Sequence, residues 1–526
     1  MDTIKIGKNV IENLTTGMYS ESKIIYREYI QNVADQIDKA IQMEMFPEDD
    51  LHIDIVIDSN TRTVRIRDNA TGIPNAEVAK KLAYVADSEK EKGVDKGFRG
   101  IGRLGGLAYC DTLKFITSYQ GEKIKTTMIW NAKELIRLLE DSSVKDSAED
   151  VLRRVISYVE EPCNEAEHFF TVELNGIRKE NNELLDIVQV RKYIASNTPV
   201  PYNNKFIYRS KIYNYMKENN LPINEYKVFV DGEIALKDYS TVLYDNNSGQ
   251  KRKYDEVFDV QICEYKNDYG DLLAWMWYGI SSFEKQIPES VNEMRGIRLR
   301  QANIQLGDSH TLENLFKEKR GNFYFIGEVH TAHKDLIPNA RRDYFNENET
   351  RNELETKLRY YFANTLNRLY YDANSAKNAF KKDIGFREKQ NEYQQKAKTA
   401  FVDEREKLKI EHELEQKKAE NDKAQKTIDK LKIKTADNEP FGKVLKAIEK
   451  KYKRKIQEEG LENEKSDRNT SNKQTNKKIT FVVDDLSKLN AKQRKLVSKI
   501  YSVINEVLPP DLSENLIKKI QDELNK

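Results

Sequence analysis

Residues 27–39 read Arg-Glu-Tyr-Ile-Gln-Asn-Val-Ala-Asp-Gln-Ile-Asp-Lys, and this stretch decides the fold. At helical spacing Glu28, Asn32, Asp35 and Lys39 share one stripe, and apolar residues occupy the remaining turns. A carboxylate, an amide and a second carboxylate are therefore aligned along one helix edge. An amphipathic helix with a solvated polar face shows the same spacing, so two glycine-bearing stretches downstream must decide between the two interpretations.

The first glycine-bearing stretch, residues 64–74, reads Val-Arg-Ile-Arg-Asp-Asn-Ala-Thr-Gly-Ile-Pro. Alternation predicts strands over residues 51–57 and 63–67, and the Asp-Asn-x-x-Gly sequence that follows is typical of a turn. Asp68 thus ends a buried strand. A carboxylate in that position can accept a hydrogen bond from the exocyclic amine of a purine.

The second glycine-bearing stretch, residues 97–106, reads Gly-Phe-Arg-Gly-Ile-Gly-Arg-Leu-Gly-Gly and runs into a helix-like segment, residues 107–110. Glycines let the backbone approach an anion, and a helix N-terminus presents unpaired N–H groups to phosphate. Alone, such a loop is weak evidence for a phosphate site.

In this order and spacing, the three stretches resemble the GHKL superfamily of ATP-binding proteins, which includes gyrase-type topoisomerases, heat-shock protein 90 chaperones, sensor histidine kinases and MutL. The N-terminal helix is most similar to that of the heat-shock protein 90 branch. The resemblance implies that Glu28 is the general base that activates water and that Asn32 is a ligand of Mg²⁺. It implies an ATP site with the following additional residues: Asp35, Lys39, Asp68, Asn69, Gly72, Gly97, Phe98, Arg99, Gly100, Ile101 and Gly102.

Within that resemblance, Asp68 binds the adenine amine, Gly72 lets the base approach, and the glycines hold the phosphates under a lid at residues 79–97. One departure is visible, because Ala70 replaces the first glycine of the family's Asp-x-Gly-x-Gly pattern. Alanine fits there if its φ angle is negative. We therefore expect an altered pocket shape and not a loss of nucleotide binding.

Further strands are predicted at residues 112–117 and 123–130, a helical insertion at 132–159, and a closing strand at 168–174. In the family, a threonine on that closing strand joins the hydrogen-bond network of the adenine-binding aspartate. Thr171 is the best match, although it is also compatible with an ordinary strand residue.

The part after residue 180 resembles the transducer or middle domain of the family. The sequence predicts a helix at residues 188–195 and strands at 226–230, 256–264 and 274–280. Residues 296–307 alternate apolar residues with Arg, Gln and Asn, which predicts a strand with one buried and one polar face.

In the family this domain carries a cation that reaches the γ-phosphate, and Arg342 takes the matching position in Pro338-Asn-Ala-Arg-Arg-Asp343. An arginine from a second domain would neutralise the terminal phosphate. Arg341 is an alternative, and a surface arginine pair beside Asp343 is the simplest interpretation. A metal site at the neighbouring His-Thr-Ala-His sequence is not expected, because no further ligands are nearby.

Towards the C-terminus, residues 388–433 predict a long helix or a weak coiled coil that serves as a spacer or dimer arm. A basic cluster at residues 450–455 is typical of a solvated helix face but could contact phosphates. Residues 482–526 predict a helical hairpin that must dimerise or dock to bury its apolar face.

The predicted fold class is α+β, with an N-terminal Bergerat-type ATP-binding sandwich, an α/β middle domain and a long helical C-terminal region. The predicted domains are an ATP-binding domain at 1–180, a middle domain at 181–375, a helical arm at 376–460, a flexible linker at 461–480 and a small helical module at 481–526.

Composition limits the class of protein. Of the 526 residues 33% are charged, the formal net charge is +1, and only three cysteines occur. No apolar run of about 18 residues predicts a membrane span, and the N-terminus has no apolar signal core, so the cytoplasm is the expected compartment. The balanced charge argues against a global field that attracts nucleic acid, and the cysteines are too few for a disulfide framework.

Three functions remain open. The leading hypothesis is an ATP-hydrolysing, Mg²⁺-dependent homodimeric clamp of the chaperone type, whose N-terminal domains associate when ATP binds and which acts on protein clients. The second is a nucleic-acid clamp that resembles MutL or the MORC proteins. The third is a nucleotide-sensing partner of a neighbouring effector in anti-phage defence. A histidine kinase would need a phosphoacceptor helix before the ATP domain, and a gyrase would need a cleavage domain.

Overall fold

The computed structural model describes residues 6–14, 21–85, 96, 100–245, 250–398, 401–436, 438–461, 486 and 488–526. The chain divides into two compact units, residues 1–367 and residues 368–526. Helices account for 49% and strands for 20% of the structure, which confirms the predicted α+β class.

An eight-stranded mixed sheet lies in the N-terminal part of the first unit, in the order β5-β4-β3-β6-β2-β1-β7-β8. Its strands are β1 (Ile53–Asp58), β2 (Thr63–Asp68), β3 (Thr112–Ser118), β4 (Ile124–Asn131), β5 (Ile156–Pro162), β6 (Phe169–Asn175), β7 (Val228–Val230) and β8 (Glu233–Ile234). Neighbours are antiparallel except β1 and β7, which are parallel. Burial alternates along β1 and β2, so one face of these strands carries the core.

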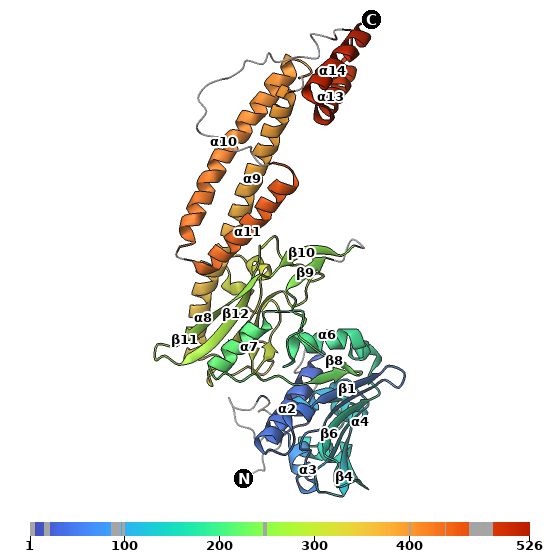
Figure 1. Cartoon of the computed structure of the whole chain (residues 1–526). Helices are drawn as coiled ribbons and strands as arrows, with labels where there is room; N and C mark the ends of the chain where they lie inside the picture. The colour runs from blue at the N-terminus through green and yellow to red at the C-terminus, as the bar shows by residue number, and fades with distance from the viewer. Residues whose placement is uncertain are drawn as a thin grey trace. The chain divides into compact units, whose positions relative to one another are not determined.

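Helix α2 (Ile24–Gln42) packs its apolar side on this sheet (Figure 1). Ile30, Val33 and Ile37 are buried in one core with Ile55 and Ile66 of β1 and β2. The polar edge of α2 is thereby turned towards the 3₁₀ helix η2 (Gly102–Ala108), which contacts α2. The remaining helices of this layer are α1 (Asn9–Leu14), η1 (Glu48–Asp50), α3 (Asn75–Ala83), α4 (Ala132–Glu140), α5 (Ala148–Val155), η3 (Lys179–Leu185) and α6 (Ile187–Asn197).

One sequence prediction for this layer is wrong in detail. The helical insertion predicted at residues 132–159 ends at Val155, because the β-branched and aromatic residues that follow pair with β4 as strand β5. The closing strand predicted at residues 168–174 is confirmed as β6, which lies between β3 and β2 in the sheet.

A five-stranded sheet follows in the same unit, in the order β11-β12-β15-β13-β14. Its strands are β11 (Asp259–Lys266), β12 (Leu272–Ile280), β13 (Gly296–Gln301), β14 (Ile304–Leu306) and β15 (Ile326–Thr331). β13 and β15 are parallel, and the other pairs are antiparallel. Accompanying elements are α7 (Arg209–Glu218), η4 (Glu313–Leu315), η5 (Lys319–Tyr324), α8 (Glu349–Tyr361) and a separate hairpin of β9 (Val242–Asp245) and β10 (Arg252–Glu256).

The strand predicted at residues 226–230 belongs to the first sheet, where it forms β7 and pairs with β1. Strands on both sides of residue 180, the predicted limit of the ATP-binding domain, therefore build the same sheet. Residues 296–307 also differ from the prediction. They form two strands joined by a turn at Ala302 and Asn303, both with positive φ. The predicted polar face is not exposed, since Arg298 and Arg300 are buried.

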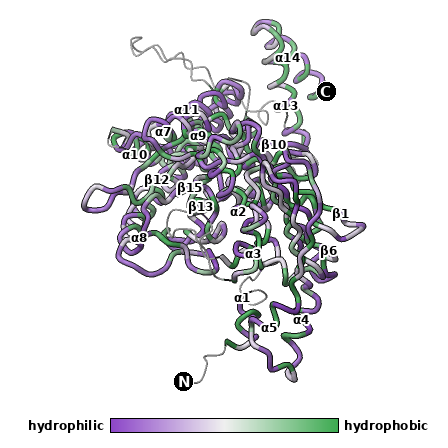
Figure 2. Tube along the Cα trace, turned by 90° about the horizontal axis from the view of Figure 1, so that it is seen from below, coloured by the Kyte–Doolittle hydropathy of each residue, from purple (hydrophilic) through white to green (hydrophobic). Residues whose placement is uncertain are grey.

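The second unit contains α9 (Asn367–Lys398), α10 (Glu404–Lys434), α11 (Glu439–Glu458), α13 (Ala491–Val507) and α14 (Pro510–Asn525). α9 and α10 are antiparallel, because Lys396 pairs with Glu406 at 2.6 Å while Lys434 pairs with Asp372 at 3.0 Å. Both helices are drawn largely in purple in Figure 2, in keeping with their charged sequence. Most of the predicted linker, residues 462–480, lies outside the described residues. Within the described ranges, no helix has both the length and the apolar character needed to cross a bilayer.

Candidate nucleotide site

Asp68 stands at the end of β2, where the register pairs it with Phe170 and pairs Arg67 with Thr171 of β6. Asp68 Oδ1 accepts the backbone N–H of Ala70 at 2.9 Å. Among the described residues, Asp68 Oδ2 and Thr171 Oγ1 are buried without a hydrogen-bond partner. Buried polar atoms normally have partners, so the two atoms fit a ligand that donates a hydrogen bond, as the adenine amine does.

The carboxyl of Asp68 is also electrostatically unusual. Burial raises its pKa to about 7, although the N–H groups of Ala70 and Phe170 act in the opposite direction. A carboxyl with a perturbed pKa and an unpaired oxygen is typical of a binding site.

Gly72 follows Asp68 with a φ angle of +66°, in the region that side chains rarely adopt. A Cβ atom at this position would lie 2.0 Å from the carbonyl oxygen of Ser118. Only glycine therefore fits this close approach of two backbone segments. Ala70 is not among the described residues with positive φ, so the alanine that departs from the family pattern is accommodated without backbone strain.

Glu28 lies in the first half of α2 with its side chain buried. Its Oε1 is 3.3 Å from Arg27 Nη2 and 3.5 Å from Arg342 Nε. Gly102, at the start of η2, faces the other oxygen, because a Cβ there would lie 2.5 Å from Glu28 Oε2. The carboxylate is thus held between two guanidinium groups and a glycine backbone.

Arg342 lies in the segment after β15, and its side chain reaches α2, the helix that packs on the eight-stranded sheet. Its Nη2 donates a hydrogen bond to the carbonyl oxygen of Lys96 at 2.8 Å. The N–H of Lys96 donates to Asp35 Oδ1 at 3.1 Å, and the Lys96 ammonium pairs with Asp38. Arg341 is exposed, so of the two neighbouring arginines Arg342 contacts Glu28.

Tyr29 connects α2 to the glycine-rich segment. Its hydroxyl donates to the carbonyl oxygen of Arg103 at 3.1 Å and accepts the N–H of Gly106 at 3.0 Å. A Cβ atom on Gly106 would lie 2.3 Å from that hydroxyl. The segment therefore lies directly against the helix that carries Glu28. Helix η2 spans Gly102–Ala108, earlier than the helix predicted at residues 107–110.

The remaining predicted residues are spread more widely. Asn32 is half-buried one turn after Glu28, whereas Lys39 is exposed in the last turn of α2. Asn69 uses its amide to accept the N–H of His52 at 2.9 Å and to donate to the carbonyl oxygen of Asp50 at 2.8 Å, so it fixes a neighbouring loop.

In the glycine-rich segment, Gly100 has a φ angle of +68° and Ile101 is buried. Gly97, Phe98 and Arg99 lie outside the described residues, as does most of the predicted lid. Arg27 and Lys96 were not predicted, although each is adjacent to a predicted residue. The feature of the sequence that could have identified them is their position next to Glu28 and Gly97.

Comparison with known proteins is consistent with this geometry. Residues 27–152 match the family described as histidine kinase-, DNA gyrase B-, and HSP90-like ATPase. Over these residues the chain is similar to the GHKL ATPases. Proteins named chaperone protein HtpG, of the heat-shock protein 90 type, also match the chain, at low identity.

The HtpG protein of Clostridium botulinum (strain 657 / Type Ba4) is 22% identical over 371 residues, which cover 60% of this chain and 58% of that protein. The HtpG proteins of Streptomyces coelicolor and Psychrobacter arcticus are 24% and 29% identical over 136 and 135 residues, about a fifth of each chain. The chain thus spans 58% of the length of the Clostridium relative.

The described residues around the candidate nucleotide site offer no cluster of metal ligands. Among the described residues no group of three or more His, Cys, Asp or Glu side chains could hold an ion. His330 instead lies 2.9 Å from Glu328 Oε2, and the His-Thr-Ala-His sequence forms no such cluster. A nucleotide-bound Mg²⁺ requires few protein ligands because phosphates and waters supply the rest. The amide of Asn32 is of the right type for that role.

Proposed function

We propose that this chain is an ATP-hydrolysing, homodimeric conformational clamp that resembles the heat-shock protein 90 chaperones and acts on protein clients in the cytoplasm. The observation that carries the proposal is the contact of Arg342 with Glu28 at 3.5 Å, which brings a segment beyond the second sheet to the GHKL domain. The unpartnered atoms of Asp68 and Thr171 support adenine as the base.

In this proposal Glu28 is the general base that takes a proton from the attacking water. Arg342 stabilises the charge that develops on the γ-phosphate. Because Arg342 follows β15, its arrival at the phosphate requires the five-stranded sheet to stay in place beside α2. ATP supplies the phosphoanhydride bond that is broken.

Binding of the nucleotide is assigned to the polar edge of α2 and to the two glycine-bearing segments. Asp68, Thr171 and Gly72 hold the base, and Asn32 would hold Mg²⁺, which neutralises phosphate charge. The other residues proposed to line the site are Asp35, Lys39, Asn69, Gly97, Phe98, Arg99, Gly100, Ile101 and Gly102.

The test compares ATP turnover by the wild type with turnover by Glu28→Ala and Arg342→Ala, each alone and with unfolded protein or DNA added. Loss of the general base should lower kcat by about 10²-fold or more, and loss of the arginine by about 10-fold or more, with ATP binding retained. Arg341→Ala is the matched control, since that arginine is exposed, and it should stay within about twofold of the wild type.

An effect of unfolded protein on the wild-type rate supports the chaperone type. If the wild type binds ATP without turnover, Glu28 is not a general base and the enzymatic proposal fails. If Arg341→Ala and Arg342→Ala lose activity equally, the role of Arg342 fails.

A nucleic-acid clamp is the second candidate. It is favoured by the exposure of Lys450, Lys453, Arg454 and Lys455 on α11, which form a basic surface. If DNA alone changes the ATPase rate, and reversal of these charges abolishes a salt-dependent shift in DNA mobility, this function replaces the chaperone.

A further inference from the structure

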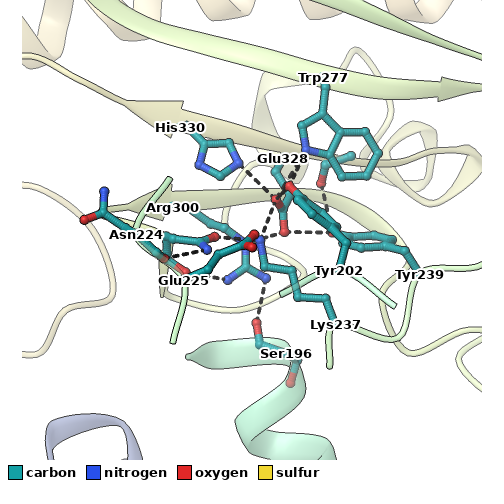
Figure 3. Close-up of polar contacts among 12 residues, drawn as sticks. Ser196, Tyr202, Asn224, Glu225, Lys237, Tyr239, Trp277, Arg300, Glu328 and His330 are labelled. Atoms are coloured by element: carbon teal, nitrogen blue, oxygen red, sulfur yellow. Dashed lines mark hydrogen bonds and ion pairs between the residues drawn. The ribbon is translucent and has the colours of Figure 1, made fainter. Parts of the chain in front are cut away.

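A buried carboxylate in the five-stranded sheet receives an unusual number of donors. Glu328 of β15 is fully buried, and Figure 3 shows the side chains that surround it. Oε1 accepts from Arg300 Nε and from Tyr239 at 3.2 Å, and Oε2 accepts from Tyr202, from Lys237 at 3.1 Å and from Trp277 at 3.3 Å, while His330 lies 2.9 Å away.

This arrangement is more than stability requires. A carboxylate offers about four lone-pair positions, fewer than the side chains that converge on it. Arg300 and Lys237 are both fully buried. Burial lowers the pKa of Lys237 to about 8, in spite of the attraction of Glu328. Buried ion pairs contribute little net stability, and their best-attested use is to fix one geometry. We therefore ask which geometry Glu328 and its donors fix.

The donors come from two structural layers. Lys237 follows β8, the last strand of the eight-stranded sheet, and its ammonium also donates to Asn303 Oδ1 at 2.6 Å, in the turn between β13 and β14. Arg300 of β13 donates through Nη2 to the carbonyl oxygen of Ser196 in α6 at 2.8 Å. α6 in turn contacts α2. Glu328 and its donors thus join the two sheets of the first unit.

The same strands support Arg342. The N–H of Gly307, directly after β14, donates to the carbonyl oxygen of Arg342 at 2.9 Å. Gln301, at the end of β13, donates through its side chain to the carbonyl oxygen of Leu336 at 2.7 Å, in the segment that leads to Arg342. Any rotation of β13 and β15 against the eight-stranded sheet must therefore move Arg342 relative to Glu28.

We propose that Glu328 and Lys237 are positioning residues that lock the five-stranded sheet onto the eight-stranded sheet and so place Arg342 at Glu28. This inference rests on the proposed function, because the benefit of the placement is ATP turnover. Neither residue touches the nucleotide site. Their role is to keep the arginine within reach of it.

Lys237→Met is the sharpest variant. It removes the tie between the segment after β8 and Glu328 and leaves Glu328 paired with Arg300. The variant keeps the Arg300–Glu328 pair and should stay folded, but the loss of the hydrogen bonds from Lys237 to Glu328 and Asn303 should lower its melting temperature. Lys211→Met is the matched control, since Lys211 pairs with Asp259 at 2.9 Å on the five-stranded side alone. Glu328→Gln is less suitable, as it leaves two buried cations with Glu225 as the neighbouring carboxyl in place of their direct partner.

The first measurement is a double-mutant cycle on kcat with Arg342→Ala. In the wild-type and Lys211→Met backgrounds, Arg342→Ala should lower kcat by about 10-fold or more. In the Lys237→Met background, it should lower kcat by less than about twofold, because the arginine is no longer delivered. Equal losses in all backgrounds would overturn the positioning role.

The second measurement needs no turnover and so separates this inference from the proposed function. Spin labels at the exposed positions of Gln42→Cys and Arg341→Cys report the distance between α2 and the Arg342 segment, in a background with Cys163→Ser and Cys263→Ala. Cys110 is buried and should stay unlabelled. Lys237→Met should broaden or shift the distance distribution, and Lys211→Met should not. An unchanged distribution in Lys237→Met overturns the inference even if ATP is hydrolysed.

Discussion

The guanidinium of Arg342 lies 3.5 Å from the carboxylate of Glu28, although the two residues belong to different layers of the first unit. Arg27 contacts the same oxygen of Glu28 at 3.3 Å. Glu28 is proposed to activate water, and Arg342 is proposed to sense the γ-phosphate. In this structure the two side chains therefore form an ion pair with each other. A phosphate that binds here must compete with Glu28 for the arginine.

This competition predicts that Glu28→Gln binds ATP more tightly than the wild type while its turnover is lost. The amide keeps the shape of the side chain but removes a negative charge close to the phosphates. An interaction of about 1 kcal/mol corresponds to a roughly fivefold lower Kd. Calorimetry with a non-hydrolysable ATP analogue measures it, and weaker binding by Glu28→Gln would refute the competition.

ATP affinity should depend on pH through Asp68. Its pKa of about 7, against an ordinary value of 3.8, means that the empty protein keeps this carboxyl protonated below pH 7. The adenine amine needs a free acceptor on Oδ2, so binding must displace that proton at lower pH. Affinity should be constant above about pH 7 and fall by up to about tenfold per pH unit below it. Binding measured from pH 5.5 to 8.5 tests this.

Asp68→Asn is the control for that pH dependence. The amide cannot titrate, and its N–H₂ group would face the adenine amine as a second donor. We expect binding that is weaker by about 10-fold or more and no longer changes with pH. A wild-type affinity that is flat from pH 5.5 to 8.5 would contradict the assignment of Asp68.

Local patterns in the sequence were sufficient for α2 and for the strand that ends at Asp68. Each is defined by residues that lie within one or two turns or one strand of each other, so periodicity alone predicts it. The same reasoning placed Gly72 at a tight turn, and its φ angle of +66° is the reason glycine is needed there.

The Glu328 group could not be predicted in this way. The alternation of residues around Arg300 shows that the strand has an apolar face and a polar face. It does not show that a buried carboxylate from another strand covers the polar face. Similarly, the strand at 226–230 was recognised, but its partner β1 lies far away in the sequence. Such pairings depend on tertiary contacts, and these cannot be inferred from residue propensities or from the spacing of apolar residues.

Gly72→Ala should strongly destabilise the domain that is built on the eight-stranded sheet. The positive φ angle costs about 1–2 kcal/mol for a side-chain residue, and the added Cβ would collide with the carbonyl oxygen of Ser118. We expect a total of about 3 kcal/mol or more in the free energy of unfolding. Gly121→Ala is the matched control, because Gly121 also has a positive φ but nothing lies within 4 Å of the position that a Cβ would occupy there. Chemical denaturation should show a loss of only about 1–2 kcal/mol for this control, and equal losses would contradict the steric argument.

Gly102→Ala should impair turnover more than binding. Its Cβ would come within 2.5 Å of Glu28 Oε2, and the carboxylate is the more mobile partner and must shift. A displacement of about 1 Å at a general base costs on the order of 10²-fold in rate, so kcat should fall by about that factor while the ADP affinity changes little. Gly385→Ala in α9, where the added methyl meets open space, should leave both quantities unchanged. A normal kcat in Gly102→Ala would show that the backbone at Gly102 does not position Glu28.

The C-terminal hairpin offers a test of the proposed homodimer. Leu496, Ile500, Val503 and Val507 form one stripe along α13, and they are 59%, 41%, 57% and 71% exposed although the other apolar side of the helix packs on α14. A stripe of this kind is typical of a surface that a second chain covers. Val503→Asp would place a charge in that interface, which is unfavourable without a partner. Sedimentation should show a dimer for the wild type and for the control Lys495→Asp on the exposed polar side, and a monomer for Val503→Asp. A wild-type monomer, or a Val503→Asp dimer of undiminished affinity, would exclude this face as the dimer interface.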